Sequence, residues 1–463
     1  MKVVCRRCPP EHPKHPPLVG FGETFDGKKV WMTELAAEYS EGLCDALASA
    51  YAAAFRSAPQ NNIIKRTMLE VGGASHTPEG PTKRVRKDLE ADQYVGGLRN
   101  PLSGLRLVPN AFEVGRKVRS VLEPFVSKHW SALTPIIDSL GSENPIEPSE
   151  EQIVELRSNL ASALSLKVTP DGLSKQGLQP WLFRALLEQS GDPEVEVPKW
   201  LETFTPLGIE EPIVPCNIFP ECAPRMIGPE SDEVKPNFLV DGHGFRNYTS
   251  YTTNQSLADG AMRREVAAGY AETGDIETLQ RKYGQLVLSK TACIVNSKDG
   301  VQKVRLIHDL RRSAVNAKIM LRERLVLPRL CDVVQSTLDL MEAGFDANHL
   351  QFMVADFRDA FKMLKTFPTE RRFLAGRALD TYFVFCTVLF GVGTGPLVWC
   401  RVAAAIMRIT QSVLCNSRIA CFVDDPIVVL GGALNNRISQ ALQALLLWTA
   451  LGAGIAWKKA SSN

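Results

Sequence analysis

Residues 420–430 read ACFVDDPIVVL, so that two adjacent carboxylates, Asp424 and Asp425, stand between two apolar runs. The runs at 419–423 and 427–430 predict two strands joined by a tight turn. Asp is common in such turns because it tolerates their backbone geometry, so a plain polar hairpin is the simplest interpretation. An ionised carboxylate is nevertheless costly to bury unless it is paired, hydrogen-bonded or bound to a cation. The rest of the chain decides between a turn and a site.

The chain has the composition of a soluble globular protein. It has 463 residues, of which 45% are hydrophobic and 22% charged, which allows two or three domains and excludes disorder throughout. The formal net charge is only +2, but residues 290–329 hold ten Lys and Arg and three acidic residues. Such a basic segment suits either a phosphate-rich partner or a merely solvated face.

The termini and cysteines predict an intracellular protein, in the nucleus or cytoplasm. Eleven cysteines are scattered, and the start MKVVCRRC lacks the apolar core of a secretory signal. Cys5, Cys8, His12 and His15 are metal-ligand types, but their spacing and two prolines leave little room for a tetrahedral zinc site. Two uncharged stretches, 381–400 and 438–457, are interrupted by Gly and Pro or by polar residues, so we expect no transmembrane segment.

The N-terminal half is predicted to be mostly helical, with a basic loop at 83–87. We expect a flexible Pro/His-rich tail over 1–30, a helical region of unknown role over 31–190, and a Pro-rich linker over 191–259. The helical region contains three stretches with helical spacing of apolar residues, at 33–55, 112–140 and 150–166, the last with Ser149 as N-cap.

From residue 260 onward, strands and helices alternate. Helices are expected over 262–284, 397–415 and 437–451, and strands over 286–288, 292–295, 304–308, 352–355 and 382–389. The turn Ser-Lys-Asp-Gly at 297–300 is typical of a hairpin because Asp-Gly supplies positive φ readily. This order predicts an α+β fold with a central antiparallel sheet.

A third carboxylate, Asp356, ends the strand expected over 352–355, 68 residues before Asp424. A sheet can bring such strand ends together. Three carboxylates without a protein counter-charge would repel one another and require divalent cations. Hard oxygen ligands in that number suit magnesium, and two ions ~4 Å apart would support in-line phosphoryl transfer.

Five motifs in order resemble reverse transcriptases. VADFRDAF (354–361), LFGVGTGP (389–396), CFVDDP (421–426) and LGAGIAWKKA (451–460) are similar to the palm motifs of that family, and VRLIHDLRRSAVN (304–316) is similar to the fingers motif. The Phe-Gly form of the glycine loop resembles retrotransposon enzymes. The resemblance covers about 286–460 and implies right-hand polymerase fingers over 260–345 and a palm over 346–463, with fingers elements interleaved.

The resemblance also implies a site. The catalytic and metal-binding residues would be Asp356, Asp424 and Asp425, which with the backbone carbonyl of Phe357 would hold two Mg²⁺ ions. The nucleotide-binding residues would be Lys298, Arg305, Phe357, Asp359, Ala360, Phe361, Gly391 and Lys459. Phe361 would be the steric gate that excludes a 2′-hydroxyl, and Lys458 is an alternative to Lys459. A core Phe, solvated charges and a plain strand-to-helix turn are the simpler interpretations of these features.

The implied function is that of a retroelement RNA-directed DNA polymerase, a nucleotidyltransferase acting on a primed RNA or DNA template with deoxynucleoside triphosphates and no membrane. Two positions depart from the family, Phe422 for a common Tyr and Phe390 for a glutamine. No thumb, connection or ribonuclease H is expected after Asn463, so the resemblance implies truncation. A non-catalytic nucleic-acid-binding remnant and an RNA-dependent RNA polymerase are the alternatives, and Phe361 argues against the latter. The sequence does not indicate oligomeric state.

Overall fold

The computed structural model describes residues 109–216, 218–227, 245–298 and 301–462, together with β1 (Phe21–Glu23) and β2 (Lys29–Trp31). The chain divides into a unit of residues 1–83, which contains the antiparallel pair β1–β2, and a unit of residues 84–463. The helix expected over 33–55, the Cys/His group, the basic cluster and most of the expected tail lie outside the described residues.

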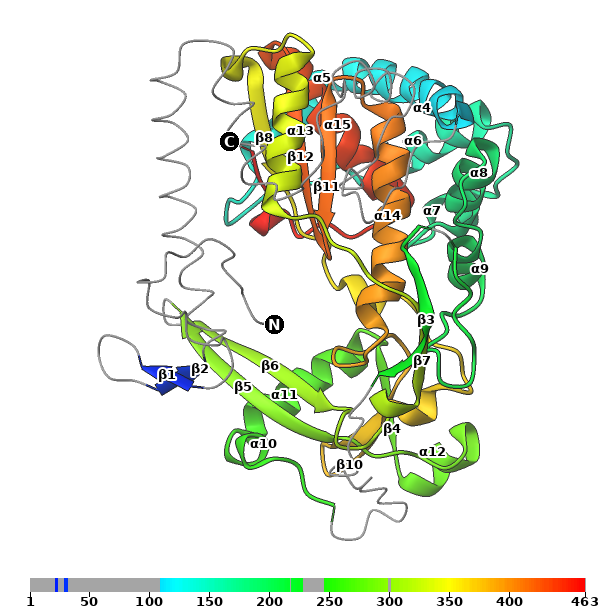
Figure 1. The fold of residues 1–463 in the computed structure, drawn as a ribbon, viewed down its shortest axis with the longest axis vertical. Coiled ribbons are helices and arrows are strands. Elements are labelled where there is room, and N and C mark those ends of the chain that lie inside the picture. Colours follow the sequence, from blue (N-terminus) through cyan, green and yellow to red (C-terminus); the bar gives the residue numbers. More distant parts are fainter. Residues whose placement is uncertain are drawn as a thin grey trace, which may run out of the picture. The chain divides into compact units, whose positions relative to one another are not determined.

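The largest sheet in the described part of the second unit has four antiparallel strands. Its strands, in spatial order, are β11 (Ser417–Phe422), β12 (Asp425–Gly431), β8 (Leu350–Val354) and β13 (Ser461–Ser462). Three helices contact this sheet: α13 (Leu330–Glu342), α14 (Gly395–Val413) and α15 (Leu434–Leu451), as Figure 1 shows. The mixture of helices and antiparallel sheet agrees with the α+β class expected from the sequence.

Helices α14 and α15 are buried around most of their circumference. Four N-terminal helices contact them: α4 (Pro109–Lys128), α5 (Trp130–Asp138), α6 (Glu150–Ala163) and α8 (Pro180–Ser190). The crossing of α4 and α14 is so close that a Cβ atom on Gly115 would lie 2.0 Å from the Ser412 carbonyl oxygen. The N-terminal helical region therefore packs as part of the same core.

Two predicted helices of this region can be compared with the structure. The helix expected over 112–140 is two helices, because the chain leaves helical geometry at His129. Helix α6 begins after Ser149, whose side chain accepts a hydrogen bond from the Gln152 backbone, as predicted.

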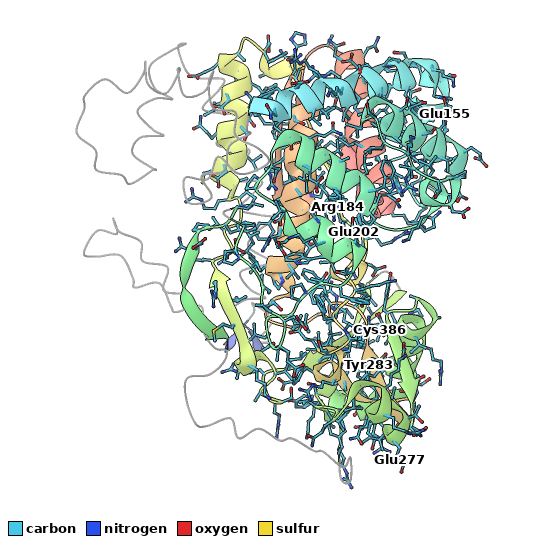
Figure 2. The ribbon with its side chains drawn as sticks, turned by 90° about the vertical axis from the view of Figure 1, so that its right-hand side faces the viewer. Glu155, Arg184, Glu202, Glu277, Tyr283 and Cys386 are labelled. Carbon is cyan, nitrogen blue, oxygen red and sulfur yellow. The ribbon has the colours of Figure 1, made fainter. Side chains whose placement is uncertain are left out.

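The segment expected to be a linker is packed over residues 191–220. It contains α9 (Glu196–Glu202). The Arg184 side chain of α8 donates a hydrogen bond to the Glu202 carboxylate at the end of α9 (Figure 2). Six of the segment's apolar side chains are buried, namely Val197, Trp200, Leu207, Ile213, Ile218 and Phe219, whereas Val195 and Val214 are exposed. The segment is rich in proline, and Pro198 itself lies inside α9. Much of the segment nevertheless buries apolar side chains against the core, which composition alone does not reveal.

Buried ion pairs fasten this segment to α14. The Arg401 guanidinium donates two hydrogen bonds to Glu194, at 2.8 and 2.7 Å, and lies 3.3 Å from Glu323. All three side chains are buried. Two turns further along α14, the Arg408 guanidinium donates two hydrogen bonds to the Asp192 carboxylate, at 2.6 and 2.8 Å. Removing one partner of such a pair leaves an uncompensated buried charge, so these contacts fix the segment in place.

The remaining strands form three small antiparallel sheets. They are β3 (Glu221–Ile227) with β7 (Ile319–Glu323); β4 (Ala271–Gly274), β10 (Thr381–Phe385) and β9 (Ala375–Ala378); and β5 (Lys290–Lys298) with β6 (Val301–Asp309). The remaining α-helices of the described part are α7 (Pro170–Ser174), α10 (Thr249–Thr253), α11 (Gln255–Ala267) and α12 (Ile276–Tyr283). The hairpin predicted with its turn at 297–300 is present, since β5 and β6 pair from Lys290 with Asp309 to Lys298 with Val301, although residues 299–300 lie outside the described part.

Three predicted elements differ from the structure. The helix expected over 262–284 is α11, β4 and α12, because Gly269 has φ +73° and residues 271–274 pair with β10. The strand expected over 382–389 ends at Phe385. The strand expected over 286–288 makes only an isolated bridge, from Leu288 to Ala375. In the part of the chain that the structure describes, no helix has the length and hydropathy needed to cross a membrane.

Candidate active site

The ladder between β8 and β12 places Asp356 opposite Asp425. The Ala355 amide donates to the Pro426 carbonyl at 3.1 Å, and the Phe357 amide donates to the Asp424 carbonyl at 2.8 Å. These bonds lie on either side of Asp356 and extend the ladder, in which Ile427 faces Val354. Residues between two such bonds form the closely spaced type of antiparallel pair, with Cα atoms ~4.5 Å apart. Strands remote in sequence thus bring the predicted carboxylates together.

Asp424 occupies a two-residue hairpin loop that a hydrogen bond from helix α14 holds in place. Phe422 pairs with Asp425, so the loop is Val423-Asp424. Val423 has φ +59° and Asp424 does not have a positive φ, the pattern of a type II′ turn. A β-branched residue is strained in this region. The indole Nε1 of Trp399, a buried residue of α14, donates to the Val423 carbonyl at 2.9 Å and holds the loop in this conformation.

The carboxylates are electrostatically coupled. Burial raises the pKa of Asp424, and the charge of Asp356 raises it further, while a backbone hydrogen bond and Lys459 lower it. Burial also raises the pKa of Asp425, followed by the charges of Asp424 and Asp356, with Lys459 again opposing. Burial and mutual repulsion therefore both disfavour the ionised carboxylates, and a further cation at this place would be favourable.

Lys459 supplies the positive charge at this site. It lies in the one-turn helix η5 (Trp457–Lys459), and its ammonium contacts Oδ2 of Asp356. The Ala456 amide donates to the Asp356 carbonyl at 2.8 Å, and Phe357 forms a bridge with Ile455. The adjacent Lys458 instead lies 3.7 Å from the exposed Glu143.

The donor set has the chemistry of a hard-cation site but does not form one as it stands. Three carboxylates and the Phe357 carbonyl, which accepts no hydrogen bond within the described residues, are ligands that Mg²⁺ prefers. Across the described ranges, however, no three His, Cys, Asp or Glu side chains lie in an arrangement that could hold a metal ion. The residue types fit the group, whereas their side chains do not converge as three ligands.

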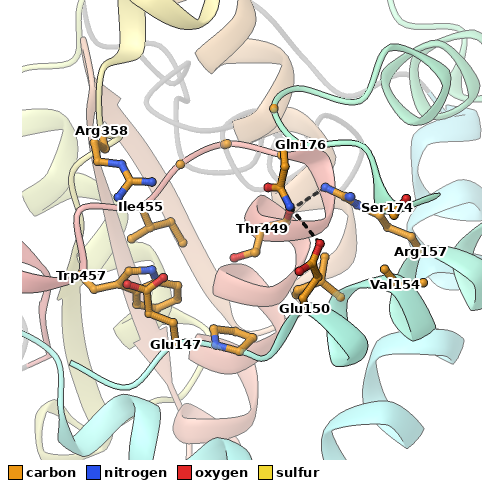
Figure 3. Close-up of a pocket in the computed structure, with 16 residues that line it drawn as sticks. Glu147, Glu150, Val154, Arg157, Ser174, Gln176, Arg358, Thr449, Ile455 and Trp457 are labelled. Carbon is orange, nitrogen blue, oxygen red and sulfur yellow. Dashed lines mark hydrogen bonds between the residues drawn. The ribbon is translucent and has the colours of Figure 1, made fainter. Parts of the chain in front are cut away.

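The loop 452–457, which precedes Lys459, is anchored to the N-terminal helices. The Gly141 amide donates to the Trp457 carbonyl at 3.0 Å. Beside this loop lies a pocket of about 240 Å³ (Figure 3). Its buried cation, Arg157, donates to the carbonyls of Ala450, Leu173, Lys175 and Thr449 at 2.8–3.4 Å. Because its hydrogen bonds go to backbone oxygens, the Arg157 guanidinium holds neighbouring segments together, and we assign the pocket no ligand.

The glycine loop is held against β6. Gly391 has φ +106°, and a Cβ atom there would lie 2.8 Å from the His308 carbonyl oxygen. The Asn316 side chain donates to the Gly391 carbonyl at 3.0 Å and accepts from the Gly393 amide at 2.9 Å. Gly391 therefore meets two requirements that only glycine satisfies, a positive φ and a close backbone approach.

Phe361 is a buried residue whose ring contacts that of an exposed one, Phe390. Its ring centroid lies 4.9 Å from that of Phe390, with a 60° tilt, and the two residues are 7% and 61% exposed. Ala360 is buried beside it, and Asp359 has φ +55° and lies 3.7 Å from the Lys362 ammonium.

The two expected phosphate ligands lie on the β5–β6 hairpin. Arg305 is exposed on β6 opposite Ile294, and within the described residues it makes no ion pair with the three carboxylates. Lys298 ends β5, and its side chain lies outside the described part.

Sequence reasoning did not single out three supporting residues. Trp399 and Trp448 enclose the Phe357 ring edge-on, with centroids 5.8 and 5.5 Å away. Both fall in apolar helix patterns that carry no signal beyond burial. Asn316 is the last residue of the 304–316 motif, and the sequence carries no other indication of its role.

Comparisons with known proteins give a weak structural likeness. No family model and no curated protein matches the chain. Among solved structures, the native prototype foamy virus protease-reverse transcriptase is 10% identical with a TM-score of 0.31, covering 47% of this chain and 25% of that one. A foamy viral protease-reverse transcriptase in complex with dsDNA is 14% identical with a TM-score of 0.32, covering 47% and 38%.

A further structure, of the foamy viral protease-reverse transcriptase dRH in complex with ds DNA, is 10% identical with a TM-score of 0.32, covering 69% of this chain and 46% of that one. The chain thus spans between a quarter and a half of the length of these structures. At this level of similarity, their activity does not transfer to this chain.

Proposed function

We propose that the chain is a magnesium-dependent RNA-directed DNA polymerase of the reverse transcriptase type, from a retroelement. The observation that supports this most directly is the pairing of Asp356 with Asp425 beside Asp424, on adjoining strands of an antiparallel sheet. The ordered sequence motifs support the same proposal. Carboxylates that can bind a cation, together with the basic β5–β6 hairpin, suit a site that acts on phosphates.

In this proposal Asp356, Asp424 and Asp425, with the Phe357 carbonyl, hold Mg²⁺. Bound Mg²⁺ supplies Lewis-acid stabilisation of phosphate charge and lowers the pKa of a bound hydroxyl. Trp399 keeps Asp424 in position through the Val423 carbonyl.

The remaining residues bind the nucleotide. Arg305 and Lys298 bind triphosphate oxygens, for which a guanidinium fork is better suited than an ammonium point charge. Phe361 excludes the 2′-hydroxyl of a ribonucleotide, and Phe390 supports its ring. Gly391, pinned by Asn316, lets the backbone approach the substrate. Lys459 faces the negative charge that develops on the phosphates. The fingers over 260–345 and the palm over 346–463 are proposed on the same basis.

Primer extension tests the proposal. The purified chain is incubated with a primed RNA template, Mg²⁺ and deoxynucleoside triphosphates, and Asp424→Asn serves as the matched control. Extension by the parent that falls at least ~10²-fold in Asp424→Asn is expected, because an amide cannot replace the charge of a carboxylate ligand. Extension at the parental rate in the variant would contradict the role of Asp424.

The second candidate is a non-catalytic protein that binds nucleic acid. It is favoured by the contact of Lys459 with Asp356 and by side chains that do not converge on a metal. Salt-dependent binding of primed template without extension under any metal condition would support it. Incorporation of ribonucleotides in preference to deoxynucleotides would instead support an RNA-dependent RNA polymerase.

A further inference from the structure

Two adjacent lysines have different environments. The Lys459 ammonium contacts Asp356, whose side chain is only 16% exposed, whereas Lys458 lies 3.7 Å from Glu143, whose side chain is 97% exposed. The carboxylate that receives Lys459 is the one opposite Asp425 in the ladder. The position of the lysine charge is therefore specific to the site.

The backbone of Lys459 is held by hydrogen bonds, whereas its side chain is largely exposed. Its amide donates to the Ala456 carbonyl at 2.8 Å, and the following strand β13 pairs with β8 through Ser461 and Val354. The Gly141 bond to Trp457 anchors the other end of η5. The Lys459 side chain itself is 59% exposed and has a flexible stem. An ammonium held this way can leave Asp356 without rearrangement of the fold.

We infer that Lys459 is a built-in counter-ion, which occupies Asp356 until a divalent cation displaces it. The ammonium contacts Asp356 and offsets part of the repulsion among the three carboxylates. A divalent cation carries twice the charge and prefers oxygen ligands, so it replaces the lysine. The inference rests on the proposed metal site but not on polymerase activity.

Mn²⁺ titration of the full chain, with free Mn²⁺ measured by electron paramagnetic resonance, tests this inference. In Lys459→Gln the competitor is gone, so Mn²⁺ binds about two- to five-fold more tightly, the range expected for an exposed ion pair. Lys459→Arg keeps the charge and stays near the parental affinity. Lys458→Gln is the matched control, because the neighbouring charge is removed while Asp356 keeps its partner. Equal or weaker binding in Lys459→Gln overturns the inference.

The same variants separate this inference from the proposed function. Tighter Mn²⁺ binding by Lys459→Gln without primer extension by the parent supports the counter-ion and contradicts the polymerase. Extension by the parent with unchanged Mn²⁺ affinity in Lys459→Gln supports the polymerase and contradicts the counter-ion. Asp424→Asn abolishes the bound Mn²⁺ if the ion occupies this site, and binding that survives this change overturns the inference.

Discussion

The buried indole of Trp399 donates a 2.9 Å hydrogen bond to the carbonyl of Val423, the strained residue directly before Asp424. A helix in the core thus determines the conformation of a loop at the surface of the candidate site. The bond joins two residues 24 positions apart, and it is the contact that links core packing to the position of the carboxylates.

Trp399→Phe removes this bond while keeping an aromatic ring. We expect it to lower the free energy of unfolding by about 1–3 kcal/mol, the cost of leaving a buried polar partner unpaired, and to reduce Mn²⁺ affinity. Trp448→Phe is the matched control, since that buried indole donates to Thr410 at 2.9 Å and also contacts Phe357. A similar loss of stability with unchanged Mn²⁺ affinity is expected in the control. Equal affinities in both variants would contradict the role of Trp399.

Asp424→Asn should stabilise the protein in the absence of metal. The folded-state pKa of Asp424 is raised, mainly by burial, so between the unfolded and folded pKa values the folded state holds more protons. The free energy of unfolding therefore falls as pH rises through that window and stays lower above it. Thermal unfolding should show a higher midpoint for Asp424→Asn than for the parent at about pH 7.5 and a smaller difference near pH 3.5.

Two comparisons check the cause of that stabilisation. Glu113→Gln removes an exposed i,i+4 ion pair with Lys117 and should lower the midpoint only slightly. Added Mg²⁺ should stabilise the parent but not Asp424→Asn. An Asp424→Asn midpoint that lies below the parental one at neutral pH would show that the carboxylate is adequately compensated.

Gly391→Ala should destabilise the glycine loop. The added methyl group meets the His308 carbonyl, and alanine is strained at φ +106°, so we expect a loss of about 1–3 kcal/mol. Gly395→Ala is the control, because its Cβ atom would make ordinary contacts at 3.4–3.5 Å. Chemical denaturation of both variants measures the difference. Equal stability would indicate that the loop shifts at little cost.

Gly115→Ala should destabilise the contact between α4 and α14. Its Cβ atom would overlap the Ser412 carbonyl oxygen, and overpacking of this kind costs about 1–3 kcal/mol or more. Gly260 lies in α11, and a Cβ atom there would be 3.9 Å from its nearest neighbour. Gly260→Ala should therefore raise the free energy of unfolding by about 0.5–1 kcal/mol. Loss in both variants, measured by thermal unfolding, would contradict the packing explanation.

Phe361→Val tests the proposed steric gate. Ribonucleotide incorporation relative to deoxynucleotide incorporation should rise about 10-fold or more, because space opens for the 2′-hydroxyl. Phe373→Val controls for lost core packing, since Phe373 is also buried but belongs to another segment. If sugar selection is the same in both variants, Phe361 is a core residue only.

The parts of the fold that were predictable are those determined locally. The strands beside Asp424, the pairing of β5 with β6 and the Ser149 cap each depend on a few neighbouring residues. The predictions failed where pairing over long distances decided the structure. Residues 271–274 form a strand because β10, over a hundred residues later, pairs with them.

The candidate site shows the same limit. The carboxylates were evident because charged residues stand at the ends of apolar strands. Neither the contact of Lys459 with Asp356 nor the support from Trp399 had a local signal, since a surface lysine and a core tryptophan fit their own segments equally well. The buried pairs of Arg401 and Arg408 with acids about two hundred positions away were equally invisible.

The close crossing of α4 and α14 at Gly115 has a practical consequence for dissecting the protein. Cutting the chain before residue 260, where the motif-bearing half begins, would strip α14 and α15 of the helices that cover them and leave Arg401 without Glu194. The resulting fragment would expose the apolar surfaces of α14 and α15 and an unpaired Arg401, and it should aggregate during expression. Biochemistry on the motifs alone would therefore misjudge the protein, and any shortened version should retain residues 109–220.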